Sequence, residues 1–462
     1  MTKTSGLGDA LYVGGYNLSG DIGSLGKIGG GPAALDITGI DKSATERIGG
    51  KRDGAIEFSA WHNPSASRAH PRLSLLPTTD TTATYCRGTT LGNPAAAQVS
   101  KQINYDGSRD ADGNLPLAVQ ALANTYGLEW GLQLTAGTRT DAAATAGTGV
   151  DYSNYQTPCL YLPGAAGAYA STPDAASLDI VGDIDIRVRA AATDWTPAAV
   201  QILVAKWTTA GDQRSWAFGI NTDGTLLLQW STDGTAGTVE SESSSAATAG
   251  VNGYELWMRV TLDVNNGAAE SDIVFYTSTD GVTWTQLGTT QHSGEVTSIY
   301  SSTAVLEVGS RAAGTADQYA GKILEASVRA PIGGTVVAHP IATIAAFADA
   351  TPLTWTINGT GYLTSSTPYG LQAYLQKLAF TGTDVTVKLQ HSLDNGSTDA
   401  WADITGGGFT QITTTTPGTE RIATAATAII KRYIRATTVT GTAFSNLQFQ
   451  VMAASNQTTV VF

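Results

Sequence analysis

The chain has 462 residues, of which 42% are hydrophobic and 14% charged, and its formal net charge is −13. This apolar fraction excludes an intrinsically disordered protein, because disorder goes with low hydrophobicity and high charge. The acidic balance excludes a tight nucleic-acid binder, which needs clustered Lys and Arg to displace counterions from phosphates. The low charged fraction, with Ala, Thr, Gly and Ser in its place, is typical of β-structure with tight turns and surfaces that face other protein. At roughly 150 residues per domain, the length predicts two to four domains.

Two cysteines, Cys86 and Cys159, are too few for a disulfide framework or a cysteine-based zinc site. We expect two free thiols, with one bridge between them as the alternative. The first residues lack the apolar core of a signal peptide, and no stretch reaches the roughly 18–20 apolar residues of a membrane span. The sequence therefore predicts a soluble protein made in a cytoplasm.

The first segment, residues 1–156, is predicted to be a β domain that opens with loops. Glycines are dense between Gly14 and Gly31, too dense for a helix or an interior strand. Residues 70–77 are predicted to be a short helix bracketed by prolines. The Ala, Thr and Gly run at 135–150 predicts a long loop or linker. Alternating or β-branched stretches predict strands at 55–61, 80–86, 97–105, 115–123 and 128–134.

The second segment, 157–364, is predicted to be a β-sandwich of short strands. Apolar and polar residues alternate over 178–189, so this strand has one buried and one wet face. The dipeptides at 223–224 and 280–281 are both Asp-Gly and predict hairpin turns, because both turn positions tolerate positive φ. Six of the ten tryptophans lie between Trp195 and Trp284, as expected for a sandwich core. Further strands are predicted at 215–220, 226–230, 254–264, 273–277, 282–287, 304–308 and 323–329.

The third segment, 365–462, continues the β pattern, with an Asp-Asn-Gly turn at 394–396. Helix is nearly absent throughout, so the predicted fold class is all-β. Strands are predicted at 371–380, 384–389, 429–435 and 447–451.

Several motifs of the first and third segments resemble the tail tube (major tail) proteins of long-tailed bacteriophages that infect actinobacteria. The resemblance implies tail-tube-type β-barrel or sandwich units, in which 365–462 completes or duplicates the unit begun by 1–156. That family is structural, so it implies no catalytic residues. The motifs are DALYVGGYNLSGD at 9–21, KRDGAIEF at 51–58, HPRL at 70–73, TTD at 78–80, YCRG at 85–88, LGNP at 91–94, YGLQAYLQ at 369–376 and FTGT at 380–383.

The second segment is similar to laminin-G and concanavalin-like lectin sandwiches (jelly rolls), which phage structural proteins often carry. Such a domain at 157–364 would be an insertion, tolerated where its two ends lie close together on a surface loop. The resemblance implies calcium or sugar binding at rim loops, without assigning the ligands to residues. The motifs are LYLPG at 160–164, DIDIRV at 183–188, YTSTDGVTW at 276–284 and LTWTING at 353–359.

No catalytic, cofactor-binding or metal-binding residues are predicted, and we do not expect an enzyme. The five histidines form no His-Glu-x-x-His pair, and the sequence has neither a Gly-x-Ser-x-Gly elbow nor a phosphate-binding loop. Exposed aromatic side chains on a rim would stack on sugars. Trp195, Trp207 and Trp284 are the candidate carbohydrate residues, with core packing as the favoured alternative.

Acidic and basic side chains have simpler predicted roles. Asp179, Asp183 and Asp185 are predicted to share the wet face of a strand, with a calcium site as the alternative. The loop carboxylates at 106, 110 and 112 are predicted to form a turn, because no Glu closes an EF-hand loop. Arg52 and Arg87 are expected to form ion pairs, within the fold or between subunits.

Together these features predict a virion structural protein, made in the host bacterial cytoplasm, that forms the major tail tube. Its partners would be copies of itself in stacked rings, other tail proteins and host surface glycans. Rings would stack through 14–50 and 135–150, and genome DNA would pass through an acidic lumen without tight binding. A ring of six copies is favoured over three. The alternatives are a minor tail, fibre or head-decoration protein, or a carbohydrate-binding module.

Overall fold

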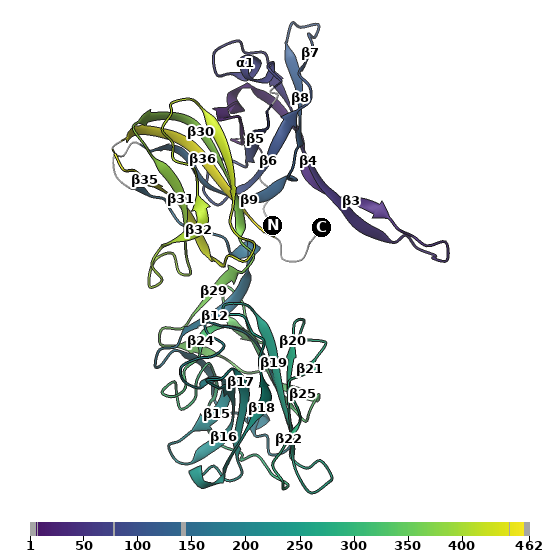
Figure 1. The fold of residues 1–462 in the computed structure, drawn as a ribbon, viewed down its shortest axis with the longest axis vertical. Helices are drawn as coiled ribbons and strands as arrows, with labels where there is room; N and C mark the ends of the chain where they lie inside the picture. Colours follow the sequence, from purple (N-terminus) through teal and green to yellow (C-terminus); the bar gives the residue numbers. More distant parts are fainter. Residues whose placement is uncertain (1–5, 7, 77–78, 140–144, 443, 457–462) are drawn as a thin grey trace. The chain divides into compact units, whose positions relative to one another are not determined.

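The computed structural model describes residues 6, 8–76, 79–139, 145–442 and 444–456, and strands dominate it (Figure 1). The predicted all-β fold class is confirmed. The chain divides into two compact units. Unit 1 comprises residues 1–155 and 367–462, and unit 2 comprises residues 156–366. No helix in the described ranges is long and apolar enough to cross a membrane.

Unit 1 contains the helical turns η1 (Ser19–Asp21), α1 (Ala69–Leu73) and η2 (Ser153–Tyr155). Its strands from the N-terminal segment are β1 (Ala10–Val13), β2 (Tyr16–Asn17), β3 (Ile22–Asp36), β4 (Arg47–Trp61), β5 (Thr81–Cys86), β6 (Pro94–Gln102), β7 (Asp106–Gly107), β8 (Pro116–Ala123), β9 (Glu129–Arg139), β10 (Thr145–Ala146) and β11 (Val150–Asp151). Those from the C-terminal segment are β30 (Leu371–Gly382), β31 (Thr386–Ser392), β32 (Ala402–Gly408), β33 (Gly418–Ala423), β34 (Ile430–Lys431), β35 (Tyr433–Val439) and β36 (Phe444–Ser455).

The two segments of unit 1 share both of its sheets. Sheet A runs β2-β1-β5-β6-β9-β36-β30-β33, with β8 joining β4, β6 and β7, and β3 joining β4. Sheet B runs β10-β35-β31-β32, with β11 also on β35. Since β9 pairs along β36, from Leu132↔Ala453 to Arg139↔Leu447, the C-terminal segment completes a sheet begun by the N-terminal segment. A core of Leu, Ile, Val and Phe side chains lies between the two sheets.

A buried polar network ties the two segments together. Glu129 on β9 accepts a hydrogen bond from the Tyr374 hydroxyl on β30 and pairs with Arg421 Nη2 at 3.2 Å. Arg421 Nε donates to the same tyrosine oxygen at 3.1 Å, and its guanidinium carbon lies 3.7 Å from the centroid of the Tyr126 ring. Burial, and then the Glu129 charge, raise the pKa of Tyr374. The network therefore joins Glu129 of the N-terminal segment to Tyr374 and Arg421 of the C-terminal segment.

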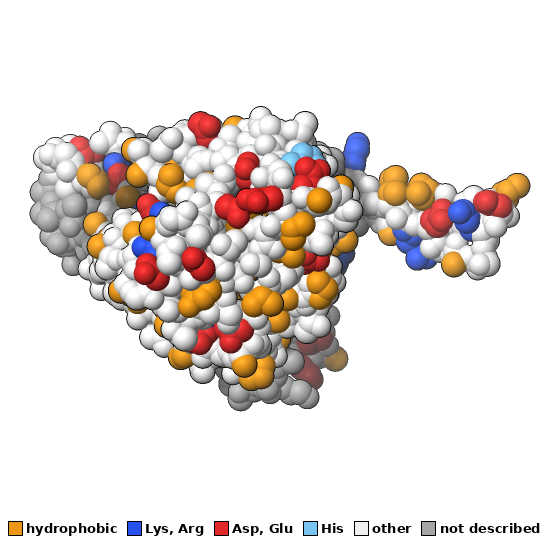
Figure 2. Space-filling model, turned by 90° about the horizontal axis from the view of Figure 1, so that it is seen from below, with side chains coloured by type: hydrophobic (Ala, Val, Ile, Leu, Met, Phe, Trp, Pro, Cys, Tyr) orange, Lys and Arg blue, Asp and Glu red, His pale blue; other side chains and the backbone are white. Residues whose placement is uncertain are grey.

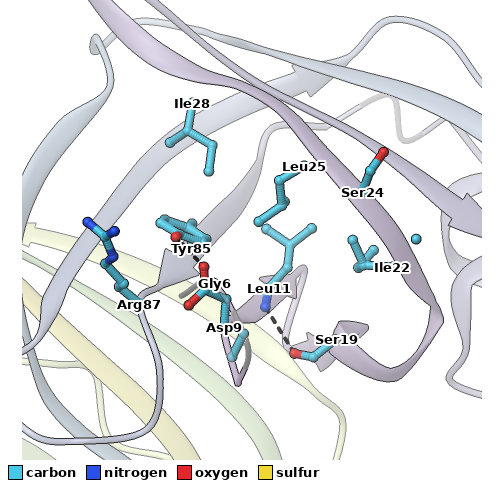
Figure 3. Close-up of a pocket in the computed structure, with 12 residues that line it drawn as sticks. Gly6, Asp9, Leu11, Ser19, Ile22, Ser24, Leu25, Ile28, Tyr85 and Arg87 are labelled. Atoms are coloured by element: carbon cyan, nitrogen blue, oxygen red, sulfur yellow. Dashed lines mark hydrogen bonds between the residues drawn. The ribbon is translucent and has the colours of Figure 1, made fainter. Parts of the chain in front are cut away.

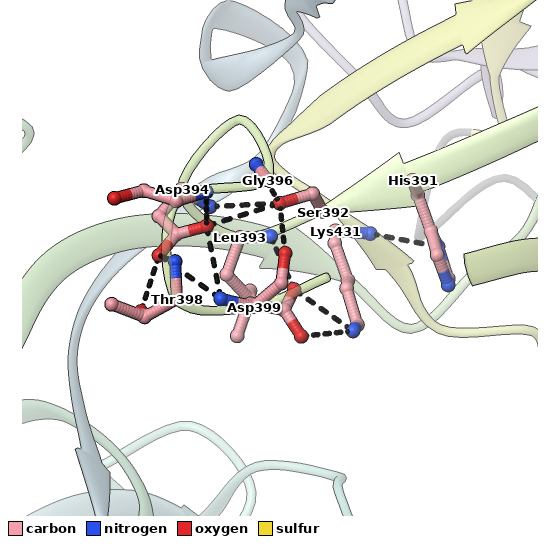
Figure 4. A network of polar contacts seen from close by, with 9 residues as sticks. His391, Ser392, Leu393, Asp394, Gly396, Thr398, Asp399 and Lys431 are labelled. Atoms are coloured by element: carbon pink, nitrogen blue, oxygen red, sulfur yellow. Dashed lines mark hydrogen bonds and ion pairs between the residues drawn. The ribbon is translucent and has the colours of Figure 1, made fainter. Parts of the chain in front are cut away.

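The predicted turn after β31 is confirmed (Figure 4). Asn395 and Gly396 both adopt positive φ, at 64° and 83°. Asp394 accepts hydrogen bonds from the backbone N–H groups of Ser397 (3.0 Å) and Thr398 (2.6 Å). Partial burial alone would raise the pKa of Asp394, but hydrogen bonds from the Thr398 hydroxyl and from the N–H groups of Thr398 and Asp399 lower it to about 2. Lys431 Nζ then pairs with the neighbouring Asp399, at 2.7 and 2.9 Å, and fixes the loop to β34.

Unit 2 is a sandwich of two antiparallel sheets. Sheet C runs β21-β20-β19-β14-β24-β12-β29, with β22, β25, β26 and β27 at its margins, and sheet D runs β18-β17-β16-β15-β23-β13-β28. Sheet C contains β12 (Thr157–Pro163), β14 (Ile184–Ala192), β19 (Leu256–Asp263), β20 (Asp272–Ser278), β21 (Thr285–Gln286), β22 (Gln291–His292), β24 (Ala320–Ala330), β25 (Thr335–Ala338), β26 (Pro340–Ala342), β27 (Phe347–Asp349) and β29 (Tyr362–Thr367). Sheet D contains β13 (Tyr169–Thr172), β15 (Gln201–Thr208), β16 (Gln213–Ile220), β17 (Thr225–Ser231), β18 (Val239–Ala247), β23 (Leu306–Val308) and β28 (Thr356–Asn358), and the helical turns are η3 (Ala176–Leu178) and η4 (Ala236–Thr238).

The core of unit 2 lies between its sheets and includes Trp195, Trp216 and Trp230. The first and last strands of the unit, β12 and β29, are antiparallel neighbours, paired from Thr157↔Ser366 to Tyr161↔Tyr362. The two ends of the inserted segment therefore lie side by side, which is the geometry that an insertion requires.

Several local predictions are wrong. The glycine-rich stretch expected to be loops is largely strand β3, which among the described residues pairs with β4 alone and packs on the core through Ile22, Leu25 and Ile28. The expected linker at 135–150 begins as strand, because β9 continues to Arg139 against β36; residues 140–144 lie outside the described residues. The strand expected at 178–189 begins only at Ile184, after η3. The predicted strand at 282–287 is reduced to Thr285–Gln286.

Other predictions stand or are shortened. The predicted helix at 70–77 is α1, one short turn over Ala69–Leu73. Cys86 and Cys159 are free thiols, each buried in its own unit, so the bridge between them is not formed.

Candidate functional sites

A two-stranded β-hairpin extends from sheet A of unit 1. Strands β3 and β4, each of 15 residues, pair with one another out to Asp36↔Arg47. Strand β4 also pairs with β8, but only over 55–61. We call the remainder, residues 29–53, the arm; among the described residues its strands pair only with each other. Figure 1 shows it as the long ribbon of β3 and β4.

The arm exposes apolar side chains that have no core behind them. Leu35 and Ile48 are cross-strand partners and are 48% and 50% exposed. Ile37 is 52% exposed, and Ile40 at the tip is fully exposed. Apolar, acidic and basic side chains all lie on the surface of the arm in Figure 2. Because an isolated two-stranded hairpin is marginally stable in water, an arm of this length gains stability when another surface covers these side chains.

A cavity of about 470 Å³ lies at the base of the arm, between β1, β3 and β5 (Figure 3). Its walls are partly apolar, with Leu11, Leu25 and Ile28 among them, and partly polar. Asp9 in the wall accepts hydrogen bonds from the Tyr85 hydroxyl, at 2.5 Å, and from the backbone N–H of Gly88, at 3.1 Å. Burial, and then the hydrogen bond to Asp9, raise the pKa of Tyr85 to about 12. The hydrogen bonds of Asp9 therefore hold this part of the wall in place.

Within the described parts of unit 1, neither Arg52 nor Arg87 forms the ion pair predicted for it. Arg52 lies on the exposed arm, and Arg87 lines the cavity. The alternative of pairs between subunits stays a prediction.

The three candidate sugar-binding tryptophans of unit 2 have different surroundings. Trp195 is 3% exposed, lies in the core and donates from Nε1 to the carbonyl oxygen of Val251. Trp207 is 4% exposed and packs in a small cluster on sheet D. Both rings therefore have packing roles and present little surface to a sugar. Trp284 is partly exposed and meets the ring of Trp257, also partly exposed, edge to face at 6.2 Å.

Trp284 lies beside an arginine cluster on the outer face of sheet C. Asp185, with no exposed surface, binds Arg187 through Nε (3.1 Å) and Nη2 (2.7 Å). It binds Arg259 in the same way, at 2.8 and 3.0 Å. The guanidinium carbons of Arg187 and Arg259 lie 5.7 and 5.8 Å from the Trp284 ring centroid, within the range of cation–π attraction. We call Asp185, Arg187, Arg259, Arg329, Trp257, Trp284 and Tyr276 the arginine face.

The three aspartates predicted to share one wet strand face do not do so. Asp185 is buried under the arginines, and although burial raises its pKa, hydrogen bonds from Arg187 and Arg259 lower it overall. Asp183 precedes the strand and accepts a hydrogen bond from the N–H of Val264. Asp179 lies 3.5 Å from the ammonium group of buried Lys206. The sequence alternation wrongly placed all three aspartates on one strand, because β14 begins only at Ile184 and includes Asp185 alone.

One group of three metal-ligand side chains converges within the described residues, at the edge of sheet C: Glu270, Asp272 and His292. Their ligand atoms lie within 4.8 Å of one another. His292 Nδ1 is 2.8 Å from Asp272 Oδ1, and Asn266 donates to both carboxylates, at 2.7 and 3.4 Å. The cluster is partly exposed, and His292 hydrogen-bonds to Asp272 within it.

No protein-family model matches the sequence, and no curated protein matches it. Among solved structures, it is similar to the CBM40 domain of the Ruminococcus gnavus IT-sialidase bound to alpha2,3 sialyllactose, at 15% identity and a TM-score of 0.27. The same domain without sugar gives 16% and 0.26, and its complex with alpha2,6 sialyllactose gives 15% and 0.24. Each likeness covers 36% of this chain and 89% of the other chain.

Proposed function

We propose that this chain is a structural subunit that assembles with copies of itself through unit 1, as in the phage tail tubes that its sequence resembles. The observation that carries the proposal is the arm. Its strands keep their pairing over 15 residues, although every residue from Pro32 to Asp53 is exposed apart from the partly buried Thr38 and Gly50. A second copy that covers the arm would bury its four large apolar side chains.

The cavity at the base of the arm supports the same proposal. It is open and partly apolar, its Asp9 and Tyr85 side chains are bonded to one another, and it adjoins the first residues of β3. A wall of this kind suits side chains of a neighbouring subunit better than a reacting substrate. The charge balance of the chain agrees with this role, because a net charge of −13 would let DNA pass without tight binding.

The test compares the sedimentation of two quadruple variants with that of the parent chain. The first replaces Leu35, Ile37, Ile40 and Ile48 with Thr, a β-branched residue that preserves strand propensity. We expect it to keep the circular dichroism spectrum of the parent and to lose higher oligomers. Its matched control replaces Val181, Val251 and Val282, which are 58%, 61% and 81% exposed on unit 2, and Val439 of unit 1, with Thr.

Removal of the arm gives an independent variant. Gly30 and Gly54 are cross-strand partners, so a two-residue Asn-Gly turn can replace residues 31–53 without disturbing the pairing of β4 with β8. Parent-like assembly by this variant and by the Thr variant would contradict an assembly role for the arm.

A second function, carbohydrate binding by unit 2, is favoured by one observation. Trp257 and Trp284 are partly exposed next to one another on the outer face of sheet C, where an aromatic ring can pack against the apolar face of a sugar. The remaining sequence-based alternatives, a minor tail, fibre or head-decoration protein, differ from a tube subunit in copy number. A soluble chain that binds sugars and does not assemble would favour the carbohydrate-binding module alone.

A further inference from the structure

The outer face of sheet C places arginines directly opposite one another. Arg187 on β14 is the cross-strand partner of Arg259 on β19, and Asp185 is the partner of Arg329 on β24. Like charges directly opposite each other on neighbouring strands are destabilising. The positive charge of this face therefore needs negative charge nearby to balance it.

The carboxylates near this face balance the positive charge of its arginines only in part. Asp185 serves both Arg187 and Arg259, and it also accepts the backbone N–H of Gly333 at 3.1 Å. Glu325, the second carboxylate near this cluster, is bound by His339 Nε2 at 2.5 Å. The guanidinium groups of Arg187, Arg259 and Arg329 therefore have two carboxylates near them, and both carboxylates already have other partners. This local excess of positive charge occurs in a chain whose net charge is −13.

Of these three arginines, Arg329 is the one that forms no ion pair among the described residues. Its Nε is buried and has no hydrogen-bond partner, and neither has the hydroxyl of Ser327, which is 3% exposed and lies on the same outer face of β24. Burial, and then the positive charge of Arg187, lower the pKa of Arg329. Arg187 and Arg259 use Nε and Nη2 for Asp185, which leaves Nη1 of each for another acceptor.

Aromatic rings border these donors. The guanidinium carbon of Arg259 lies 4.9 Å from the centroid of Tyr276, and Trp284 lies within 6 Å of both Arg187 and Arg259. A planar carboxylate matches the bidentate geometry of a guanidinium fork, and a sugar ring can pack on an indole beside it. A free inorganic anion would use the arginines but not the ring.

We propose that the arginine face binds a saccharide that carries a carboxylate, with the carboxylate on Arg187, Arg259 and Arg329 and the sugar ring against Trp284. The proposal rests on the proposed carbohydrate-binding function of unit 2 and names its ligand class. The ligand supplies the negative charge that the face lacks. Neutral saccharides of the same length would contact only the aromatic rings.

The test is isothermal titration of the full chain with a hyaluronan tetrasaccharide, which carries glucuronate, and with neutral chitotetraose. We expect the acidic saccharide to bind at least about tenfold more tightly, the factor that one charge-assisted contact supplies. Arg329→Gln should remove about tenfold of that affinity without changing binding of the neutral sugar, and Arg329 has no carboxylate to orphan. Trp284→Ala should weaken both.

The matched control is Arg214→Gln, a change of the same kind on sheet D, where Arg214 pairs with exposed Asp212. It should bind like the parent. Equal affinity for acidic and neutral saccharides would overturn the acidic-ligand inference and leave carbohydrate binding standing. Binding of neither would overturn both. Sodium sulfate is titrated in the same way. If it binds as tightly as the hyaluronan tetrasaccharide, the site recognises an anion alone, and the inference that it recognises a saccharide is overturned.

Discussion

Replacing Glu129 with Gln should destabilise unit 1 without moving the transition of unit 2. The Glu129 and Arg421 side chains are only 4% and 11% exposed, so Gln would leave a guanidinium buried without its counter-charge. Breaking a buried pair from one side costs about 3–5 kcal/mol, and we expect about 3 because the Tyr126 ring still contacts Arg421. For a unit of this size that lowers its Tm by roughly 6–12 °C.

Arg421→Met should cost a similar amount, because it leaves Glu129 buried without a cation. The double variant removes both charges, so its loss should be smaller than the sum of the single losses by about 2 kcal/mol or more. Scanning calorimetry measures this directly, with the unit 2 transition as the internal control. Strict additivity would refute the reasoning, since it would mean that residues 129 and 421 do not stabilise unit 1 as one network across its two segments.

Three further outcomes follow from single groups. Because folding lowers the pKa of Asp185, this carboxylate stabilises unit 2 fully above about pH 4, the usual range of a carboxyl pKa, and the stabilisation is lost as the pH falls further. Asp185→Asn should therefore remove this part of the acid sensitivity of unit 2. Thermal melts from pH 7 to pH 3 measure the effect. Asp394→Ala should lower the stability of unit 1 by about 1 kcal/mol, since its turn hydrogen bonds are partly exposed to water; an unchanged urea midpoint would contradict this. Burial raises the pKa of both Cys86 and Cys159 to about 12, so native protein should not react with a thiol reagent at pH 8, whereas unfolded protein should give two thiols.

Strand positions followed from sequence where alternation coincided with burial. Residues 80–86 and 371–380 were predictable because β-branched and apolar residues mark strands β5 and β30, which lie inside sheet A. The Asp-Gly turn at 223–224 was predictable from its residue types, and Gly224 adopts a positive φ of 81° there. The arm was not, because a strand that packs on nothing shows no alternation and is rich in glycine.

The candidate sites were less predictable, since they depend on cross-strand register. Trp284 was predicted as a candidate from its residue type, whereas the arginines beside it are brought together by the pairing of β14 with β19 and β24. Trp195 and Trp207 have the same residue type and are buried. Composition could suggest that some tryptophans of unit 2 pack in the core, but only the sheet order determines which ring stays at the surface.

Negative-stain electron microscopy of the purified full chain across a concentration series tests the central proposal most directly. Assembly through the arm predicts rings or hollow tubes that lengthen with concentration, and the count of subunits per ring would decide between three and six copies. The variant with residues 31–53 replaced by a two-residue turn should give dispersed particles under the same conditions. Dispersed monomers of the parent chain at every concentration would contradict the proposed role as a self-assembling structural subunit.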